Sequence, residues 1–277
     1  MWAMYTGLPQ QGAKGDESKF GYTQTTKDNL FQSLLSDTER EIREGDGGEL
    51  TGAICKMQAL HSSSTLGVNI FDYWREKSLI TIAKALRIPS SGVKELRFEG
   101  KLRHASFHTG DFPKASNIDV LLRYNGVNTA MVGIECKYSE AYGSGHPGMK
   151  PIYLKHASLW TEFPHLQLLA KSIAPNDASF KHLHPAQLIK HILGLHHACA
   201  KYKRPKNKFR LLYLWYDVPT EDGMKHRQEI ERFTEIAVKD NVQFNAITYQ
   251  EVIHNLYRQG AFQEHKQYIQ YLANRYL

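Results

Sequence analysis

Three ionisable residues with the spacing of a catalytic cluster stand in two short apolar stretches. Asp119 lies within residues 116–122, and Glu135 and Lys137 lie within residues 132–138. The composition of both stretches predicts β-strands. Alternate side chains of a strand share a face, so Glu135 and Lys137 project together, and hairpin pairing would bring Asp119 beside Glu135.

These residue types suit the hydrolysis of a phosphodiester bond. Two carboxylates can hold a hard divalent cation such as Mg²⁺ through oxygen. A bound metal polarises the phosphodiester and acidifies a water molecule, while the ammonium group of Lys137 can orient that water or stabilise charge at the phosphate. A lysine between two carboxylates should stay protonated, which weakens its case as a general base. A structural ion pair at a sheet edge is the alternative that the spacing leaves open.

Asp119 and Glu135-Cys136-Lys137 resemble the signature of the PD-(D/E)XK nuclease superfamily, which is an Asp on one strand and (Asp/Glu)-x-Lys on the next. Glu135 follows Asp119 by 16 positions, and Ile118 stands where the signature has Pro. The resemblance implies a restriction-endonuclease-like core, a Mg²⁺ cofactor for which Mn²⁺ substitutes, and DNA as the substrate. It also implies Asp119, Glu135 and the backbone of Cys136 as metal ligands.

A second resemblance extends beyond this motif. Residues 61–71, 98–99, 134–140 and 187–191 are similar to a bacterial family of restriction-endonuclease-like proteins, and the similarity covers about residues 50–255. Members of such a family are mostly inferred nucleases. This likeness therefore supports the fold more than the substrate.

Further residues are candidates for the same site. Glu99 ends the strand before Asp119 and is a candidate third carboxylate and metal ligand, with an exposed strand end as the alternative. Glu76, on the preceding helix, lies where the superfamily often places an additional acid. Gln187, on a later helix, is a candidate for orienting a phosphate or a water. Glu140 is expected at the surface.

The charge distribution favours a polyanionic partner. The net charge is +7, from 35 Lys and Arg against 28 Asp and Glu, and no acidic residue occurs between Asp177 and Asp217. We expect this basic interval to contact phosphates of DNA, with an ordinary solvated surface as the alternative. The predicted nucleic-acid-binding residues are Lys190, Lys201, Lys203, Arg204, Lys206 and Lys208.

The elements that position these residues follow from the hydrophobic periodicity. Residues 1–25 are expected to form a flexible lead-in. The expected order is helices at about 26–44 and 65–87, strands at 93–99, 117–124 and 129–138, a helix from His184-Pro185, a strand at 209–216, a helix at 224–239, a strand near 242–247, a helix opened by the capping box Thr248-x-x-Glu251, and a last helix at 262–277. This order predicts a single α/β domain over residues 1–277, with a mixed sheet flanked by helices on both faces.

Several classes of protein are disfavoured. The sequence has no apolar run of about 18 residues, and its start lacks the pattern of a signal peptide. Three cysteines argue against a disulfide framework and favour a reducing cytoplasm. The histidines between residues 182 and 197, with Cys199, lack the spacing of a zinc motif, so we expect them to pack rather than to bind zinc.

The sequence thus predicts a Mg²⁺-dependent nuclease acting on DNA. A nucleic-acid-binding module of the same fold without turnover is the main alternative, and the presence of Asp119, Glu135 and Lys137 together counts against it. RNA or branched DNA as the substrate, endonuclease or exonuclease action, a homodimer, and a methyltransferase or other defence-system partner all remain open.

Overall fold

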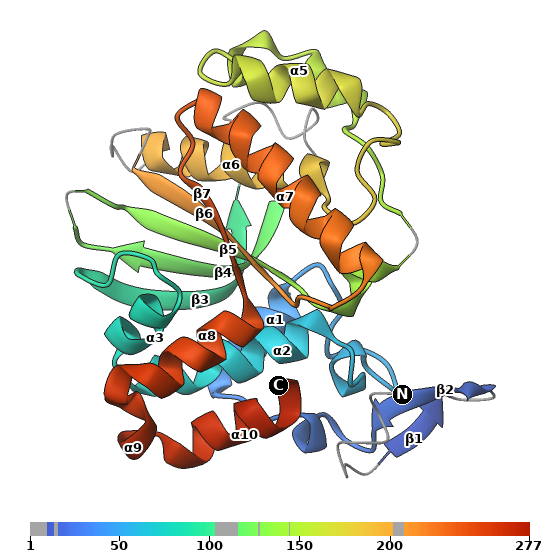
Figure 1. Ribbon diagram of the computed structural model, residues 1–277, viewed down its shortest axis with the longest axis vertical. Coiled ribbons are helices and arrows are strands. Elements are labelled where there is room, and N and C mark those ends of the chain that lie inside the picture. Colours follow the sequence, from blue (N-terminus) through green and yellow to red (C-terminus); the bar gives the residue numbers. More distant parts are fainter. Residues whose placement is uncertain (1–9, 14–15, 103–115, 127, 144, 202–207) are drawn as a thin grey trace.

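The central feature of the fold is a five-stranded mixed β-sheet (Figure 1). The computed structural model describes residues 10–13, 16–102, 116–126, 128–143, 145–201 and 208–277. In order across the sheet, the strands are β3 (Val93–Leu102), β4 (Ser116–Tyr124), β5 (Met131–Lys137), β6 (Phe209–Trp215) and β7 (Phe244–Thr248). β3, β4 and β5 pair antiparallel, whereas β6 and β7 continue the sheet in parallel from β5. β5, which carries Glu135 and Lys137, is therefore the middle strand.

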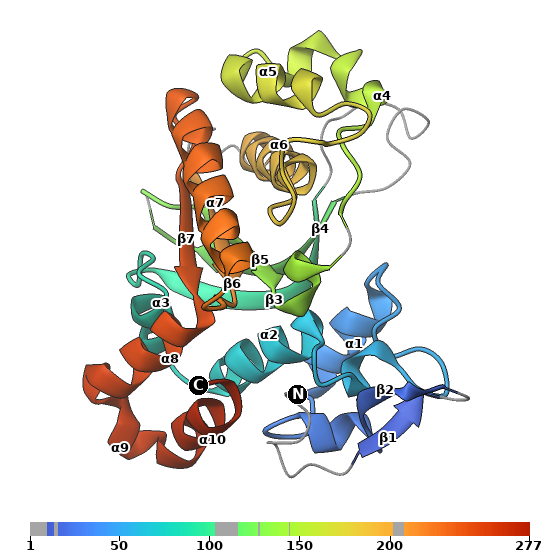
Figure 2. The same cartoon turned by 45° about the vertical axis from the view of Figure 1, so that its right-hand side comes forward.

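Helices cover both faces of this sheet (Figures 1 and 2). On one face lie α6 (Pro185–Lys201) and α7 (Glu221–Lys239), with α5 (Pro164–Ser172) beyond them. The other face carries α1 (Ser36–Glu44), α2 (Ser63–Phe71), α3 (Leu79–Ala85), α8 (Tyr249–Leu256) and, beyond these, α10 (Lys266–Tyr276). The expected α/β class, a mixed sheet between two helical layers, is confirmed.

Alternation along the strands divides the apolar side chains between two cores. Val120 and Ile134 belong to the core beneath α2, and Ile118 and Leu211 belong to the core beneath α6.

Several shorter elements connect the layers: η2 (Thr26–Asn29), η3 (Lys56–Gln58), η4 (Asp72–Glu76), η5 (Ser139–Tyr142), α4 (Pro151–Leu154), η6 (Ala157–Leu159), η7 (Tyr257–Ala261) and α9 (Phe262–Glu264). Among these, α4 and η6 lie, together with the longer helix α5, in a stretch for which the sequence predicted no element.

The helix predicted over residues 26–44 is wrong in its first half. Only η2 and α1 are helical, and the chain between them is extended at Leu30 and Leu35. Tertiary hydrogen bonds replace helical ones there: the side chain of Asn69 accepts from the Phe31 amide at 2.8 Å, and that of Asp72 accepts from the Leu35 amide at 3.3 Å. Buried polar side chains from α2 and η4 therefore override the local helical pattern.

The helix predicted over residues 65–87 is likewise divided. It consists of α2, η4 and α3, with an extended residue at Lys77. The break lets α3 turn against α8 and β3. The capping box of Thr248 with Glu251 is confirmed, because the side chain of Thr248 accepts from the Glu251 amide and the carboxylate of Glu251 accepts from the Thr248 amide.

The expected lead-in contains regular structure. β1 (Gln10–Ala13) and β2 (Asp16–Thr23) form an antiparallel hairpin, and the carbonyl of Gly21 accepts from the Leu60 amide at 2.7 Å. The main chain of the hairpin is thus joined to the segment that precedes α2. Among the described helices, none combines the length and the apolar character that a membrane crossing requires.

Candidate active site

The candidate site lies where β4 and β5 part. Their described main-chain pairing runs from Arg123 opposite Met131 to Val120 opposite Ile134. One position further on, the Oδ2 atom of Asp119 accepts a hydrogen bond from the Cys136 amide at 2.6 Å. The Asp119 carboxylate thus takes the place of a main-chain acceptor between the strands. This contact fixes it beside β5.

Glu135 is fully buried on the middle strand and is held by two basic side chains. Its Oε1 atom accepts from Nζ of Lys137 at 2.6 Å, and its Oε2 atom lies 2.8 Å from Nε2 of His191 on α6. The other ring nitrogen of His191 lies 2.7 Å from Oγ of Ser116, which orients the imidazole. Burial disfavours the ionised carboxyl group, but Lys137 and His191 outweigh burial and lower the pKa of Glu135 to about 2.

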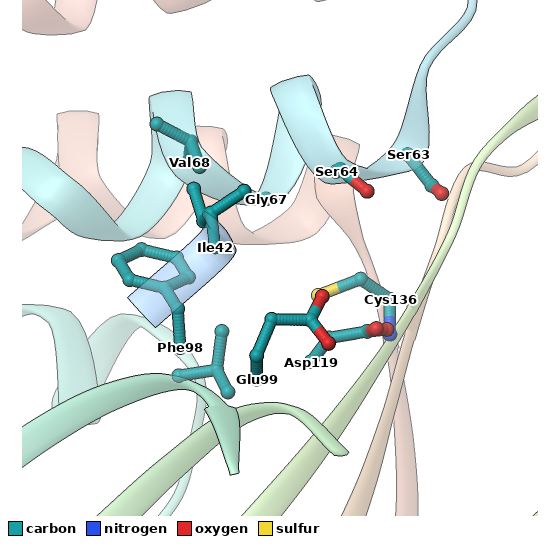
Figure 3. Close-up of a pocket in the computed structure, with 10 residues that line it drawn as sticks. Ile42, Ser63, Ser64, Gly67, Val68, Phe98, Glu99, Asp119 and Cys136 are labelled. Carbon is teal, nitrogen blue, oxygen red and sulfur yellow. The ribbon is translucent and has the colours of Figure 1, made fainter. Parts of the chain in front are cut away.

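Glu99 reaches the site through an unusual backbone conformation. It stands between the pairs Phe98–Val120 and Gly100–Ile118, opposite Asp119, with φ of 50°. A non-glycine residue in this left-handed region costs about 1–2 kcal/mol. Figure 3 shows the resulting direction of the side chain, toward Asp119 and Cys136.

Two contacts with α1 and its end support this conformation of Glu99. The carboxylate of Glu41 on α1 accepts from the Phe98 amide at 2.9 Å, which holds the strand directly before Glu99. At the end of α1, a Cβ atom added to Gly45 would lie 2.9 Å from Oε2 of Glu99, so glycine leaves the room that this carboxylate occupies. Because strained residues gather at functional sites, the conformation of Glu99 favours a role in the site.

The cluster carries more negative charge than its basic residues balance. Burial and the nearby carboxylates of Glu49 and Glu135 raise the pKa of Glu99 to about 7. Burial and Glu135 also raise the pKa of Asp119 well above its ordinary value. Burial alone would lower the pKa of Lys137, but Glu135 and Asp119 raise it, so this lysine stays protonated. A further cation would relieve the repulsion among the carboxylates.

A pocket adjoins the carboxylates (Figure 3). One wall comes from the first turns of α2, where Ser63 and Ser64 line the pocket across from Glu99 and Asp119. The residues that line the pocket are Ile42, Ser63, Ser64, Gly67, Val68, Phe98, Glu99, Asp119, Val120 and Cys136. The pocket is therefore polar at the carboxylates and apolar beneath α1 and α2.

The chemistry of these donors suits a hard divalent ion, because every charged donor is a carboxylate oxygen. Across the described ranges, no three His, Cys, Asp or Glu side chains already surround one point as metal ligands. Both oxygens of Glu135 are engaged, one by Lys137 and one by His191. The fit to a metal thus rests on the donor types and on the unbalanced charge.

The structure brings together four of the predicted residues, Asp119, Glu135, Lys137 and Glu99. Gln187 is half-buried on α6 and, within the described part of the chain, has no hydrogen bond to this group. Its role stays a prediction.

The two acids weighed beside Glu99 lie at the surface. Glu76 is exposed at the end of η4 and does not line the pocket. Glu140 is exposed as expected, and its carboxylate accepts from the Tyr138 amide at 3.1 Å.

Sequence reasoning missed His191. Its place one helical turn after Gln187, on the same face of a helix, was the available signal. His191 is buried on α6, and its Nε2 atom lies 2.8 Å from Glu135 on β5.

The predicted nucleic-acid-binding residues are only partly described. Lys190 is half-buried on α6, Lys201 ends that helix, and Lys208 precedes β6. Lys203, Arg204 and Lys206 lie outside the described residues.

The mixed sheet, with Asp119, Glu135 and Lys137 on its neighbouring middle strands, defines an α/β protein with a restriction-endonuclease-like fold. The family model described as Restriction Endonuclease associating with ARP matches residues 5–277, and the chain belongs to this family. No curated protein matches the chain, and no solved structure does.

Proposed function

We propose that this chain is a Mg²⁺-dependent nuclease that hydrolyses phosphodiester bonds of DNA through a PD-(D/E)XK-type active site. The observation that carries the proposal is the convergence of Glu99, Asp119 and Glu135 from three adjacent strands, with Lys137 hydrogen-bonded to Glu135. Burial and the neighbouring carboxylates raise the pKa values of Glu99 and Asp119, so a bound cation would favour their ionised forms. Membership in a restriction-endonuclease family supports the same chemistry.

Each acidic residue has a defined part in the proposal. Asp119 and Glu135 are the main metal ligands, with Glu99 as a third carboxylate and the backbone of Cys136 as a further ligand. Mg²⁺ held there, or Mn²⁺ in its place, supplies Lewis acidity toward the phosphodiester and lowers the pKa of a water molecule. The hydrogen bond from the Cys136 amide keeps one oxygen of Asp119 in place and leaves the other available.

Lys137 acts as a cation in this proposal. Its ammonium group is protonated and donates to Glu135, so it enters the reaction as a hydrogen-bond donor and a positive charge. Placed at the phosphate, it orients the attacking water and stabilises the charge that develops on the phosphate oxygens. Because the carboxylates hold its proton, Lys137 is not the base that accepts the proton of that water.

Cleavage assays with several nucleic acids test the proposal. Purified protein should degrade DNA with Mg²⁺ or Mn²⁺ and leave it intact with EDTA. Ca²⁺ should support binding with little turnover, because its looser coordination polarises the phosphate less. Duplex, single-stranded and branched DNA, with RNA alongside, define the substrate class.

A pair of variants makes this assay specific. Asp119→Asn should abolish cleavage, whereas Glu235→Gln, an exposed change on α7 with the same loss of charge, should leave it unaltered. DNA binding without cleavage under every metal condition would show that the chain is a non-catalytic binding module and not a nuclease. Full cleavage by the folded Asp119→Asn variant would sink the site assignment.

The family description also supports a proposal about association. The family is described as associating with ARP, and we propose the same association for this chain. Co-expression of the chain with ARP should yield a complex that elutes as one peak in size-exclusion chromatography. Elution of the two proteins in separate peaks would count against the association.

A further inference from the structure

A second group of basic side chains lies beside the carboxylate cluster. The rings of His146 and His184 stack, with centroids 4.5 Å apart and planes 22° apart. His184 immediately precedes α6, and its Nε2 atom lies 3.1 Å from the carbonyl oxygen of Pro147. That contact makes Nε2–H the donor and joins the loop after η5 to the start of α6. A backbone carbonyl thus holds the His184 ring of the stacked pair.

Two lysines complete this basic group. Lys190 lies on α6 directly before His191, which contacts Glu135, and Lys150 lies directly before α4. Burial lowers the pKa of Lys190, and the charge of Lys150 lowers it further. Lys190 also lies near enough to Glu135 and Lys137 for their charges to act on it. The basic group and the carboxylate cluster are therefore neighbours.

The basic group lacks an anion. Burial, as the largest cause, and the neighbouring His146 and Lys190 lower the pKa of His184 to about 3, so this imidazole is neutral. Both ring nitrogens of His146 are buried and, within the described part of the chain, have no hydrogen-bond partner. Buried polar atoms without a partner are costly and call for an explanation. Within the same ranges, none of the four side chains forms an ion pair with a carboxylate.

We propose that His146, His184, Lys150 and Lys190 form a subsite for one phosphate group of the bound nucleic acid, adjacent to the carboxylate cluster. The N–H group of His146 and the ammonium groups of Lys150 and Lys190 are donors for phosphate oxygens, and the charge of the ammonium groups strengthens such bonds. His184, whose Nε2–H already donates to Pro147, holds the ring of His146 in place by stacking on it. Lys190 and the histidine pair are positioning residues in this arrangement. They fix one phosphate so that a neighbouring phosphodiester bond reaches Asp119 and Lys137.

This inference rests on the proposed function, since it takes the ligand to be a nucleic acid. The subsite is a localised group near Glu135, whereas the basic interval between Asp177 and Asp217 would contact phosphates along its whole length. Residues 141–216 contain eleven Lys and Arg and two acidic residues, so the surrounding chain attracts anions as well. The subsite predicts binding that depends on Lys190 far more than on an equally charged lysine elsewhere.

Histidine ring signals in NMR spectra provide the test, with inorganic phosphate as the probe and EDTA present throughout. The spectrum of His146→Gln assigns one of the stacked rings. In the wild-type protein, phosphate should shift the signals of His146 and His184 along a saturable curve. Lys190→Gln should weaken this binding about tenfold, the value of one charge-assisted hydrogen bond. Lys190→Arg should restore most of it.

Lys171→Gln, an exposed change in the last turn of α5, is the matched control and should leave phosphate binding unaltered. Lys190→Gln should fold normally, because the change removes a charge that burial opposes. Equal phosphate affinity in the wild type and the folded Lys190→Gln variant would overturn the proposal. Saturable shifts confined to other histidines would overturn it as well.

A short DNA duplex supplies the second arm of the test. The duplex should shift the same two signals, and inorganic phosphate should compete with it. Binding of free phosphate that the duplex does not displace would overturn the assignment to nucleic acid. The outcome is separable from nuclease activity. A chain that shows both shifts but never cleaves keeps the subsite and loses the nuclease, and a chain that cleaves without either shift loses only the subsite.

Discussion

Replacing Glu99 with Gln should stabilise the metal-free protein in a manner that depends on pH. The substitution removes a charge from the carboxylate cluster but preserves the length of the side chain and an oxygen acceptor. It also leaves a non-glycine residue at φ of 50°, so the backbone strain is the same in both proteins. The comparison therefore isolates the cost of the ionised carboxylate.

The magnitude follows from the pKa of Glu99. The folded state raises this pKa from 4.5 to about 7, through burial and the charges of Glu49 and Glu135. At 1.36 kcal/mol for each pKa unit, the ionised form costs the folded state about 3 kcal/mol. The folded protein keeps a proton that the unfolded chain has released, so wild-type stability falls as pH rises from about 4.5 to 7. Above about pH 7, the ionised carboxylate of Glu99 lowers the stability of the wild type by the full amount of about 3 kcal/mol.

Urea denaturation in EDTA, at several values between pH 4.5 and 8.5, measures this cost. The free energy of unfolding of Glu99→Gln should equal that of the wild type at the acidic end and exceed it by about 3 kcal/mol at the alkaline end. Glu235→Gln, at an exposed position on α7, should match the wild type throughout. A difference between Glu99→Gln and the wild type that does not change with pH would refute the reasoning.

Four further outcomes are expected. Lys137→Met should lower the single-turnover cleavage rate severely with a smaller effect on the Mg²⁺ concentration for half-maximal rate, and a normal rate would rule out its role at the phosphate. The free energy of unfolding of Glu99→Gly in urea should exceed that of Glu99→Ala by about 1 kcal/mol, because only glycine adopts φ of 50° without strain. The reverse order would show that the backbone at residue 99 is not strained. His191→Leu should destabilise the fold by about 3 kcal/mol by leaving one oxygen of the buried Glu135 carboxylate without its imidazole partner, and an unchanged urea midpoint would contradict this. Lys203→Glu combined with Lys206→Glu should weaken DNA binding and reduce the slope of log K against log salt by about 0.9 for each lost phosphate contact, whereas an unchanged slope would show that neither lysine contacts phosphate.

The sequence by itself determined the class of fold and the pairing of Glu135 with Lys137 in the candidate site. Alternation along residues 132–138 placed Glu135 and Lys137 on one face, and the structure has them 2.6 Å apart on the middle strand. The short apolar runs fixed five strands and their approximate bounds. Each of these features is local, because the period of a strand or a helix and the residues that end it are written in neighbouring positions.

Only the tertiary structure decided which distant groups complete the cluster. The fork between β4 and β5 directs Asp119 to the Cys136 amide, and the support of β3 by α1 turns Glu99 into the site. His191, which the sequence grouped with packing histidines, contacts Glu135 instead. Buried polar groups must find partners, and the nearest partner is set by how helices pack on the sheet. The same requirement extended residues 30–35 against Asn69, because a tertiary hydrogen bond to a buried amide outweighs a weak local preference for helix.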